Sequence, residues 1–573
     1  MTDVLDRLCG AVSGPEMMQH MAVFGRRTKV AGTPEELESL RYVRAMMDRY
    51  GFRTTMLLHD AYISIPGRAR VEALGRTLRC ITHSFSRSSE PSGTQGTLVD
   101  VGAGGEAEFA VAGVRGKIAL VDGIANPAVT LRASLAGAIG QVHLSPHEHL
   151  HEMCISPVWG SPTDEQLDRL PRTVVTTIGS DDGAALRQAM QGAAVTVTLH
   201  AEVDTGWRKT PILIADMDGP AGGGDELYVL YSGHHDTWYY GVMDNGGANA
   251  TMMEVARLCA TRRTQWQRGL RVAFWSGHSQ GRYSGSTWYA DANWEEIARR
   301  CVAHVNVDST GGMGNTVVAD TGTAAELAAL AREAVRMRAG QELSGRRMGR
   351  AGDESFWGIG VPAMFGNMGE QPATGAANAS AAVFGGGARL GHGTGWWWHT
   401  PDDLLDKIDE AILVRDTRVY LHAVWRLLAD PVLPIDWEEH AVYLLAELAT
   451  FSEIVEGRFD LFVLISRAER LQANAAAVKH CGAPPDRINK ALLAVAHALV
   501  PVDYSTGDRF GQDPALAQAA YPSLQPLRRL ATLPAESDEA KFLTVRMMRA
   551  RNRVAVALNE ANAALECCLK GDA

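Results

Sequence analysis

Four long apolar runs, each ending in polar or glycine-rich residues, constrain the fold of this chain more than any other feature. They are TPILIADMDG (210–219), ELYVLYSGHHD (226–236), RGLRVAFWSG (268–277) and CVAHVNVDSTGG (301–312). Near-continuous apolar strands are typical of a sheet that helices cover on both faces. Strand-like and helix-like segments alternate up to about residue 433. The pattern predicts an α/β fold with a mostly parallel sheet flanked by helices.

A chain of 573 residues is too long for a single hydrophobic core. Short β-rich runs separated by glycines, ending in one helix, predict an insert with its own core. Near the C-terminus glycines and strands almost vanish, which predicts an all-α bundle. We divide the chain into a first α/β part (1–92), a β-rich inserted domain (93–205), a second α/β part (206–432) and a helical domain (433–573).

Two local patterns are clear within this division. Residues 34–50 carry apolar positions at helical spacing, preceded by a threonine that can cap the helix and followed by Gly51. The Gly/Ala-rich stretch 372–395 predicts a long loop, and long loops in compact domains are often functional.

Charge and composition exclude several classes of partner. The net charge of -11 provides no basic stripe for nucleic acid or anionic membrane. No window approaches 18 unbroken apolar residues, so we expect no spanning helix. The first residues lack the basic and apolar regions of a signal peptide. None of the eight cysteines forms a CxxC pair, and we expect reduced thiols in a cytoplasmic protein.

Candidate metal ligands lie at the ends of the predicted strands. The strand period of two places His234 and Asp236 on one side and His235 on the other. A carboxylate commonly orients a ligand imidazole, so His234 is the better ligand and Asp236 the better supporting group. Asp244 begins a turn eight residues after Asp236 and can return to the same pocket.

Two further residues extend this set. Asp308 follows the apolar strand AHVNVD, and His399 stands between three tryptophans and an acid-rich segment. Sites in open α/β sheets form outside the carboxyl ends of strands. Two histidines and two aspartates are a common zinc set, and a bridging carboxylate can hold two ions close together.

The order H-x-D, D-N, N-x-D and H-T-P-D-D-x-x-D-K-I-D resembles that of the M28 family of zinc metallopeptidases. The larger plan is similar to the glutamate carboxypeptidase and transferrin receptor branch, with a protease-associated insert and a helical dimerisation domain. The resemblance implies that His234 and Asp308 hold one zinc, His399 the other, and that Asp244 bridges them while Asp236 orients His234. It also implies a cis peptide between Asp244 and Asn245 and a homodimer through the C-terminal helices.

The chain departs from this family after Trp275. Relatives carry two glutamates there, one as general base and one as metal ligand, whereas this chain has His278, Ser279 and Gln280, with a one-residue ambiguity in the count. Losing a general base typically costs about 10²- to 10⁴-fold in rate. His278 can replace the lost ligand or act as the base, because imidazole binds zinc, iron or nickel and titrates near neutrality.

A third possibility takes the missing carboxylate from Asp353 or Glu354, which are expected to line the same cleft. The tryptophan run Trp396, Trp397 and Trp398 favours an apolar or aromatic substrate group. Arg282 and Arg350 are expected near the cleft as substrate-binding or surface charges.

Three functions follow as hypotheses. The first is a metallohydrolase cutting an amide or related bond of a small substrate or peptide, with water on the metal as nucleophile and His278 or Glu354 as proton carrier. The second is a re-purposed enzyme with a single iron, manganese or nickel ion acting on a small molecule. The third is a non-catalytic binding protein on a peptidase fold.

Overall fold

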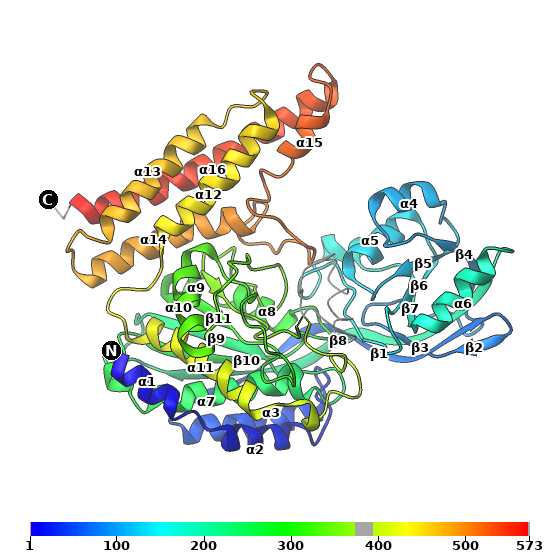
Figure 1. The fold of residues 1–573 in the computed structure, drawn as a ribbon, viewed down its shortest axis with the longest axis horizontal. Helices are drawn as coiled ribbons and strands as arrows, with labels where there is room; N and C mark the ends of the chain where they lie inside the picture. Colours follow the sequence, from blue (N-terminus) through cyan, green and yellow to red (C-terminus); the bar gives the residue numbers. More distant parts are fainter. Residues whose placement is uncertain (1, 373–392, 571–573) are drawn as a thin grey trace.

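The computed structural model describes residues 2–372 and 393–570. Most of the Gly/Ala-rich stretch 372–395 lies outside this part of the chain. Figure 1 shows a central α/β body, an inserted region on its right and a helical region above it. Among the described residues, no helix combines the length and the apolar character that crossing a membrane requires.

Within the described residues, the strands form a 12-stranded sheet in the order β12-β11-β9-β10-β8-β4-β5-β6-β7-β3, with β1 paired to β2 and β8. Strands β9 to β12 run parallel, whereas β8 is antiparallel to β1, β4 and β10. The predicted α/β fold is confirmed, and its sheet is mixed. The body strands are β1 (Arg53–Ala73), β8 (Thr196–Met217), β9 (Tyr228–His234), β10 (Gly269–Trp275), β11 (Cys301–Asn306) and β12 (Ala363–Met364).

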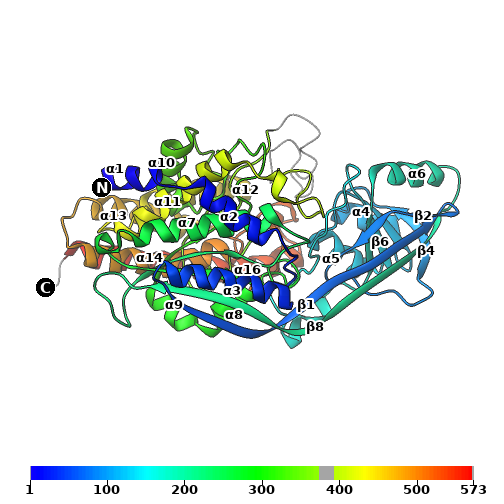
Figure 2. The ribbon, with the colours of Figure 1, turned by 90° about the horizontal axis from the view of Figure 1, so that it is seen from below.

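Helices cover both faces of the body sheet (Figure 2). Helices α1, α2, α3, α7 and α11 pack together on one face, α8 and α9 lie on the other, and α10 packs on α11. Their bounds are α1 (Thr2–Gly10), α2 (Gly14–Phe24), α3 (Pro34–Arg49), α7 (Ala248–Ala260), α8 (Ser284–Ala292), α9 (Trp294–Arg300), α10 (Ala328–Ala339) and α11 (Glu410–Ala429). The predicted helix over 34–50 is α3, with Thr33 accepting a hydrogen bond from the N–H of Glu36 as its N-cap.

Strand β9 shows why these runs are apolar throughout. Val229 and Tyr231 belong to the core beneath α7 and α11, whereas Tyr228 and Leu230 belong to the core that faces α8 and α9. Successive side chains of a strand alternate between its faces, so a strand covered on both sides needs apolar residues at every position. His234 is the last residue of β9 and lies, still buried, at the carboxyl end of this strand.

Strands β1 and β8 are long enough to run from the body into the inserted region (Figure 2). There β8 pairs with β4, and the sheet continues through the strands of the insert. Val71 and Leu78 share a core there with Leu98 and Leu199, so residues before 93 pack with the insert. The remaining elements of this region are β2 (Arg76–Leu78), β3 (Cys80–Thr82), β4 (Thr94–Asp100), α4 (Glu106–Ala112), β5 (Ile118–Asp122), α5 (Pro127–Ala136), β6 (Gly140–Leu144), β7 (Val174–Ile178) and α6 (Ser180–Met190).

The expectation of one helix in the insert is wrong, because α4 and α5 precede α6. Helix α5 begins at Pro127 after Asn126, whose side chain accepts a hydrogen bond from the N–H of Val129, and it ends at Gly137 in the left-handed region. These are standard helix start and stop signals. The small residues of α5 concealed them from an analysis based on apolar periodicity.

The C-terminal region is helical, as predicted. Its helices are α12 (Trp437–Val455), α13 (Phe462–Val478), α14 (Pro485–Tyr504), α15 (Leu527–Thr532) and α16 (Asp538–Lys570). Helix α16 packs on α13 and α14, and α12 packs on α13. An ion pair at 2.8 Å between half-buried Arg347 of the body and buried Asp503 of α14 joins this region to the body.

Candidate metal centre

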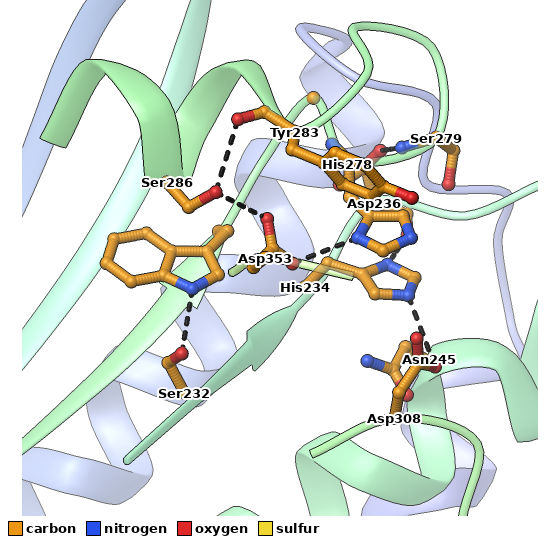
Figure 3. A network of polar contacts seen from close by, with 12 residues as sticks. Ser232, His234, Asp236, Asn245, His278, Ser279, Tyr283, Ser286, Asp308 and Asp353 are labelled. Carbon is orange, nitrogen blue, oxygen red and sulfur yellow. Dashed lines mark hydrogen bonds and ion pairs between the residues drawn. The ribbon is translucent and has the colours of Figure 1, made fainter. Parts of the chain in front are cut away.

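Three side chains meet where three neighbouring parallel strands end (Figure 3). His234 ends β9, His278 follows β10 by three residues, and Asp308 follows β11 by two. Strand β9 lies between the other two strands. Their ligand atoms all lie within 4.8 Å of one another. The carboxyl ends of parallel strands share one edge of a sheet, so the strand order brings these residues together.

The carboxylate of Asp244 lies between the imidazole rings of His234 and His399. Its Oδ1 is 3.1 Å from Nε2 of His234, and its Oδ2 is 3.0 Å from Nε2 of His399. Oδ1 of Asp308 approaches Nε2 of His234 at 3.5 Å. The peptide bond between Asp244 and Asn245 is cis, as the family resemblance implied. The four residues proposed as ligands from the sequence therefore turn their nitrogen and oxygen atoms toward one another.

Main-chain carbonyl groups determine which nitrogen of each imidazole carries the proton. Nδ1 of His234 is 2.8 Å from the carbonyl oxygen of Asp236, and Nδ1 of His399 is 2.6 Å from that of Glu152. A carbonyl oxygen can only accept, so we assign the proton to Nδ1 in both rings. A neutral ring then presents the lone pair of Nε2 to Asp244.

Without a cation, two buried polar atoms between these rings lack a hydrogen-bond partner in the described part of the chain. Nε2 of His234 and Oδ1 of Asp244 are buried and have no hydrogen-bond partner among the described residues. Burial raises the pKa of Asp244, but the positive charge that His234 and His399 carry when protonated brings it far below its usual range. A metal ion would supply this positive charge while both imidazoles stay neutral. An ionised carboxylate between two imidazole lone pairs matches the nitrogen and oxygen donors that zinc prefers. The residues present therefore fit one or two metal ions.

His278 stacks on His234 and is held by Asp353 (Figure 3). The ring centroids are 3.7 Å apart with an interplanar angle of 14°. Nδ1 of His278 is 2.9 Å from Oδ2 of Asp353, and the other oxygen of Asp353 accepts from Ser286 Oγ at 2.8 Å. Burial raises the pKa of Asp353, but His278, together with His234 and the hydrogen bond from Ser286, brings it below its usual value. An ionised Asp353 holds Nδ1–H of His278 and leaves Nε2 for the cluster.

Asp236 supports the site differently from the expectation. Its main-chain carbonyl, not its carboxylate, accepts from His234. The carboxylate accepts instead from the main-chain N–H groups of His278, at 3.1 Å, and Ser279, at 2.8 Å. Asp236 therefore holds the loop after β10, and it positions His278 through the backbone. His235 turns to Asn249 and is a packed histidine, as expected.

The side chain of Gln280 turns away from the cluster. Oε1 of Gln280 accepts from the N–H of Ala31 at 3.0 Å, and its Nε2 donates to the carbonyl of Thr237 at 3.1 Å. Gln280 therefore ties two loops together and faces neither His234 nor Asp308. The side chain that enters the cluster is His278.

The assignment of Glu354 as a proton carrier is wrong. Its Oε2 is 3.2 Å from Nδ1 of His304, within the buried core of the sheet. Burial raises the pKa of Glu354 despite this neighbour. Adjacent residues in this segment point in opposite directions, so Asp353 reaches His278 while Glu354 reaches β11.

The tryptophan run packs rather than forming an open substrate wall. Trp397 is 3% exposed and Trp398 is 7% exposed, and both belong to a core shared by the body and the insert. Trp398 stacks on His399 with centroids 3.5 Å apart. Half-buried Trp396 stacks on His149 of the insert. Trp397 and Trp398 are therefore too buried to contact a substrate, and Trp398 instead supports the ring of His399. Of the three tryptophans, Trp396 alone keeps its expected role.

The two arginines expected near the cleft contact the C-terminal region. Arg282 donates to the carbonyl of Ala515 at 3.4 Å, and Arg350 donates to that of Pro514 at 2.9 Å. Arg350 also lies over the ring of Trp159, 4.2 Å from its centroid. Both guanidinium groups thus hold a loop of the C-terminal region against the body, which their sequence positions gave no means of predicting.

Sequence reasoning missed two supporting residues. Asp403 is buried, and its carboxylate accepts from the N–H groups of Met243, at 2.8 Å, and Asp244, at 3.0 Å. Asn249 donates to the carbonyls of His234 and Asn245. Asp403 stands in the HTPDD motif with His399, so its position beside a ligand was a usable signal. Asn249 offered none.

Comparison with known proteins agrees with this geometry. Residues 213–424 match peptidase family M28. A probable glutamate carboxypeptidase of Zea mays is 24% identical over 344 residues, which cover 49% of this chain and 48% of that protein. An aminopeptidase of Mus musculus is 26% identical over 121 residues, covering 20% of this chain and 16% of that protein. The chain therefore spans about half or less of the length of these relatives.

Solved structures show the same fold. An aminopeptidase from Aneurinibacillus sp. strain AM-1 superposes with a TM-score of 0.55 and 20% identity, covering 74% of this chain and 96% of that chain. A peptidase M28 precursor from Shewanella amazonensis superposes with a TM-score of 0.57 and 17% identity, covering 74% and 95%. His234, Asp244, Asp308 and His399 all lie within residues 213–424, the segment that matches peptidase family M28.

Proposed function

We propose that this protein is a metal-dependent hydrolase that cleaves an amide bond of a peptide or a related small substrate. One observation carries the proposal: Asp244 places one carboxylate oxygen against Nε2 of His234 and the other against Nε2 of His399. Main-chain carbonyls hold both rings with their lone pairs toward it. The family match of residues 213–424 supports the same reaction class.

His234, Asp308 and His399 would hold the metal, with Asp244 between the two halves of the site. Bound zinc supplies a Lewis acid and makes water acidic enough to ionise near neutral pH. His278 stands where relatives of the family carry a glutamate, and Asp353 orients it. We propose that His278 replaces the lost ligand, because one of its ring nitrogens lies within 4.8 Å of the ligand atoms of His234 and Asp308. A carboxylate that holds the other nitrogen is the usual support of a ligand histidine.

The substrate class follows from what surrounds this site. The guanidinium of Arg350 donates to the main-chain carbonyls of Asp513 and Pro514, and that of Arg282 donates to the carbonyl of Ala515. We therefore propose that neither arginine selects an acidic substrate, and that a neutral peptide or amide is the substrate class. Half-buried Trp396, stacked on His149, can contact an apolar group of it.

Hydrolysis before and after metal removal tests this function. A mixture of dipeptides and amino-acid amides is incubated with the protein, and the products are identified by mass spectrometry. We expect cleavage that a chelator abolishes and added zinc restores, and a loss of at least about 10²-fold in His399→Ala. Glu354→Gln, which changes a buried carboxylate facing His304, serves as the control. Cleavage that survives complete metal removal contradicts the proposal.

A second candidate is an enzyme with one transition-metal ion acting on a small molecule. The cluster of His234, His278 and Asp308 favours it, because two histidines and one carboxylate form a common ligand set for iron. The metal distinguishes the two functions. Zinc in one or two equivalents supports the hydrolase, whereas a single equivalent of iron, manganese or nickel that disappears in His278→Ala supports the alternative.

We also propose a homodimer through the C-terminal helices and a protease-associated role for the insert. Exposed apolar side chains follow one face of α16, namely Phe542 (76% exposed), Val545, Met548 and Val556. Met547 and Val554, on the opposite face, are fully buried in the bundle. A long helix with an apolar stripe on each side commonly packs against a second partner.

A further inference from the structure

The inserted region contacts the loop that carries the candidate ligand His399. The contacts come from residues 147–152, which follow strand β6 of the insert. The N–H of Glu152 donates to the carbonyl of His399 at 3.1 Å, and Nδ1 of His399 donates to the carbonyl of Glu152 at 2.6 Å. These two hydrogen bonds join residues 247 positions apart, and one of them comes from the ligand ring itself.

His399 needs this support because its backbone is unusual. Its φ of 58° lies in the left-handed region, which a residue with a Cβ atom adopts only when its surroundings impose it. The preceding residue, Trp398, stacks on the ring of His399. The carbonyl of Trp398 in turn accepts from Nδ1 of His151, a residue with no exposed surface.

The tautomers of the insert histidines show that His151 donates the hydrogen bond to Trp398. Because the carbonyl of Trp398 only accepts, Nδ1 of His151 carries the proton and its Nε2 is an acceptor. Nε2 of His147 lies 3.4 Å from that atom, and Nδ1 of His147 accepts the N–H of His149. His147 therefore donates from Nε2 to His151, and the chain of hydrogen bonds from His149 to Trp398 is complete. This pairing also leaves no lone pair free for a metal between His147 and His151.

We propose that His151 is a positioning residue for the metal centre: it holds the Trp398–His399 backbone so that Nε2 of His399 faces Asp244. The insert is then a structural part of the site, because the His399 half of the donor set depends on it. This inference rests on the proposed metal-dependent function.

Metal binding measured apart from turnover tests the proposal. His151→Leu fills the space but removes the donor to Trp398, and His151→Asn retains an amide donor at the position of Nδ1. Supporting residues of ligand histidines typically contribute 10- to 100-fold in metal affinity. We expect zinc affinity, measured by competition with a chelator, to fall by about 10- to 100-fold in His151→Leu and to be largely restored in His151→Asn. If the wild type binds two equivalents, one is expected to be lost.

His143→Leu is the matched control. His143 is another fully buried histidine of the insert, and it contacts Gly123 and Gln141 rather than the 396–399 loop. We expect wild-type zinc affinity in this variant. If His151→Leu fails to fold, His151→Gln replaces it, since the glutamine amide reaches the position of Nε2 instead of Nδ1. We expect His151→Gln to bind zinc as weakly as is predicted for His151→Leu.

The outcomes separate the two proposals. Wild-type zinc affinity in folded His151→Leu overturns the positioning role and leaves the proposed function intact. Equal weakening in His151→Leu and His143→Leu also overturns it, because the effect would then come from general damage to the insert. A wild-type protein that binds no metal contradicts both proposals.

Discussion

Oδ2 of Asp353 lies 2.9 Å from Nδ1 of His278, and the ring of His278 is stacked on that of His234. This contact fixes the orientation of the His278 ring beside His234. A carboxylate that holds one nitrogen of an imidazole leaves the other as a basic, well-oriented donor. Asp353 therefore makes His278 an oriented imidazole beside His234.

Replacing Asp353 is expected to weaken metal binding. Asp353→Leu leaves Nδ1–H of His278 without its acceptor, and we predict a 10- to 100-fold loss of zinc affinity, measured by chelator competition. Asp353→Asn keeps an acceptor but loses the charge, and a smaller loss is expected. Glu354→Gln, at the adjacent buried carboxylate, should bind zinc like the wild type. Unchanged affinity in Asp353→Leu would show that His278 is not a ligand.

Truncation of Trp397 is expected to reduce stability before it changes substrate choice. Trp397 is almost fully buried between the body and the insert, and its Nε1 contacts Sδ of Met243 at 3.4 Å. Large-to-small changes at such sites typically cost about 3–5 kcal/mol in the free energy of unfolding. We predict a clear fall in Tm for Trp397→Ala and little change for half-buried Trp396→Ala. An unchanged Tm in Trp397→Ala would contradict the packing described above.

The ion pair between Arg347 and Asp503 is expected to hold the C-terminal region to the body. Asp503 has no exposed surface, and Arg347 also stacks on Tyr504 with its guanidinium carbon 3.8 Å from the ring centroid. Removing one partner of a fully buried pair typically costs about 3–5 kcal/mol, and less is expected here because the side chain of Arg347 is 20% exposed and water can reach the remaining charge. Asp503→Ala should therefore lower the unfolding temperature, followed by circular dichroism.

Glu202→Ala is the matched control for this ion pair, because it breaks the exposed pair with Arg68. Solvent and salt screen exposed pairs, which contribute little to stability, so the unfolding temperature of Glu202→Ala should stay near that of the wild type. Equal effects of the two substitutions would mean that Arg347 and Asp503 do not anchor the helical region.

A charge on the exposed face of α16 is expected to separate the proposed dimer. Phe542→Glu places a carboxylate in the apolar stripe, where burial against a second copy would be costly. We predict a mass near that of one chain by light scattering for this variant and twice that mass for the wild type. Val111→Glu, at an equally exposed apolar position on α4, should leave the mass unchanged. A monomeric wild type would refute the dimer.

The sequence was sufficient for features that depend on local pattern or on the order of strands. Residues 34–50 carried both their helical period and their cap, and His234 and Asp308 were placed at strand ends that share a sheet edge. The resemblance to a known family brought Asp244 and His399 to the same place. These inferences needed no knowledge of side-chain direction.

The remaining features depend on tertiary packing, which local pattern does not encode. Asp353 and Glu354 are neighbours in sequence, yet one faces His278 and the other faces His304. The carboxylate of Asp236 turned to the 278–279 backbone because that loop folds over it. Arg282 and Arg350 reached carbonyls more than 160 residues away, a contact that only the docked C-terminal region creates.

Metal analysis of the purified protein tests the central claim most directly. Protein prepared without chelator is measured by elemental mass spectrometry, together with His234→Ala and His399→Ala. The account predicts one or two equivalents of bound metal, zinc first among them, and a loss in both variants while their circular dichroism stays native. A folded wild-type protein that takes up no metal even when zinc is supplied in excess would contradict it.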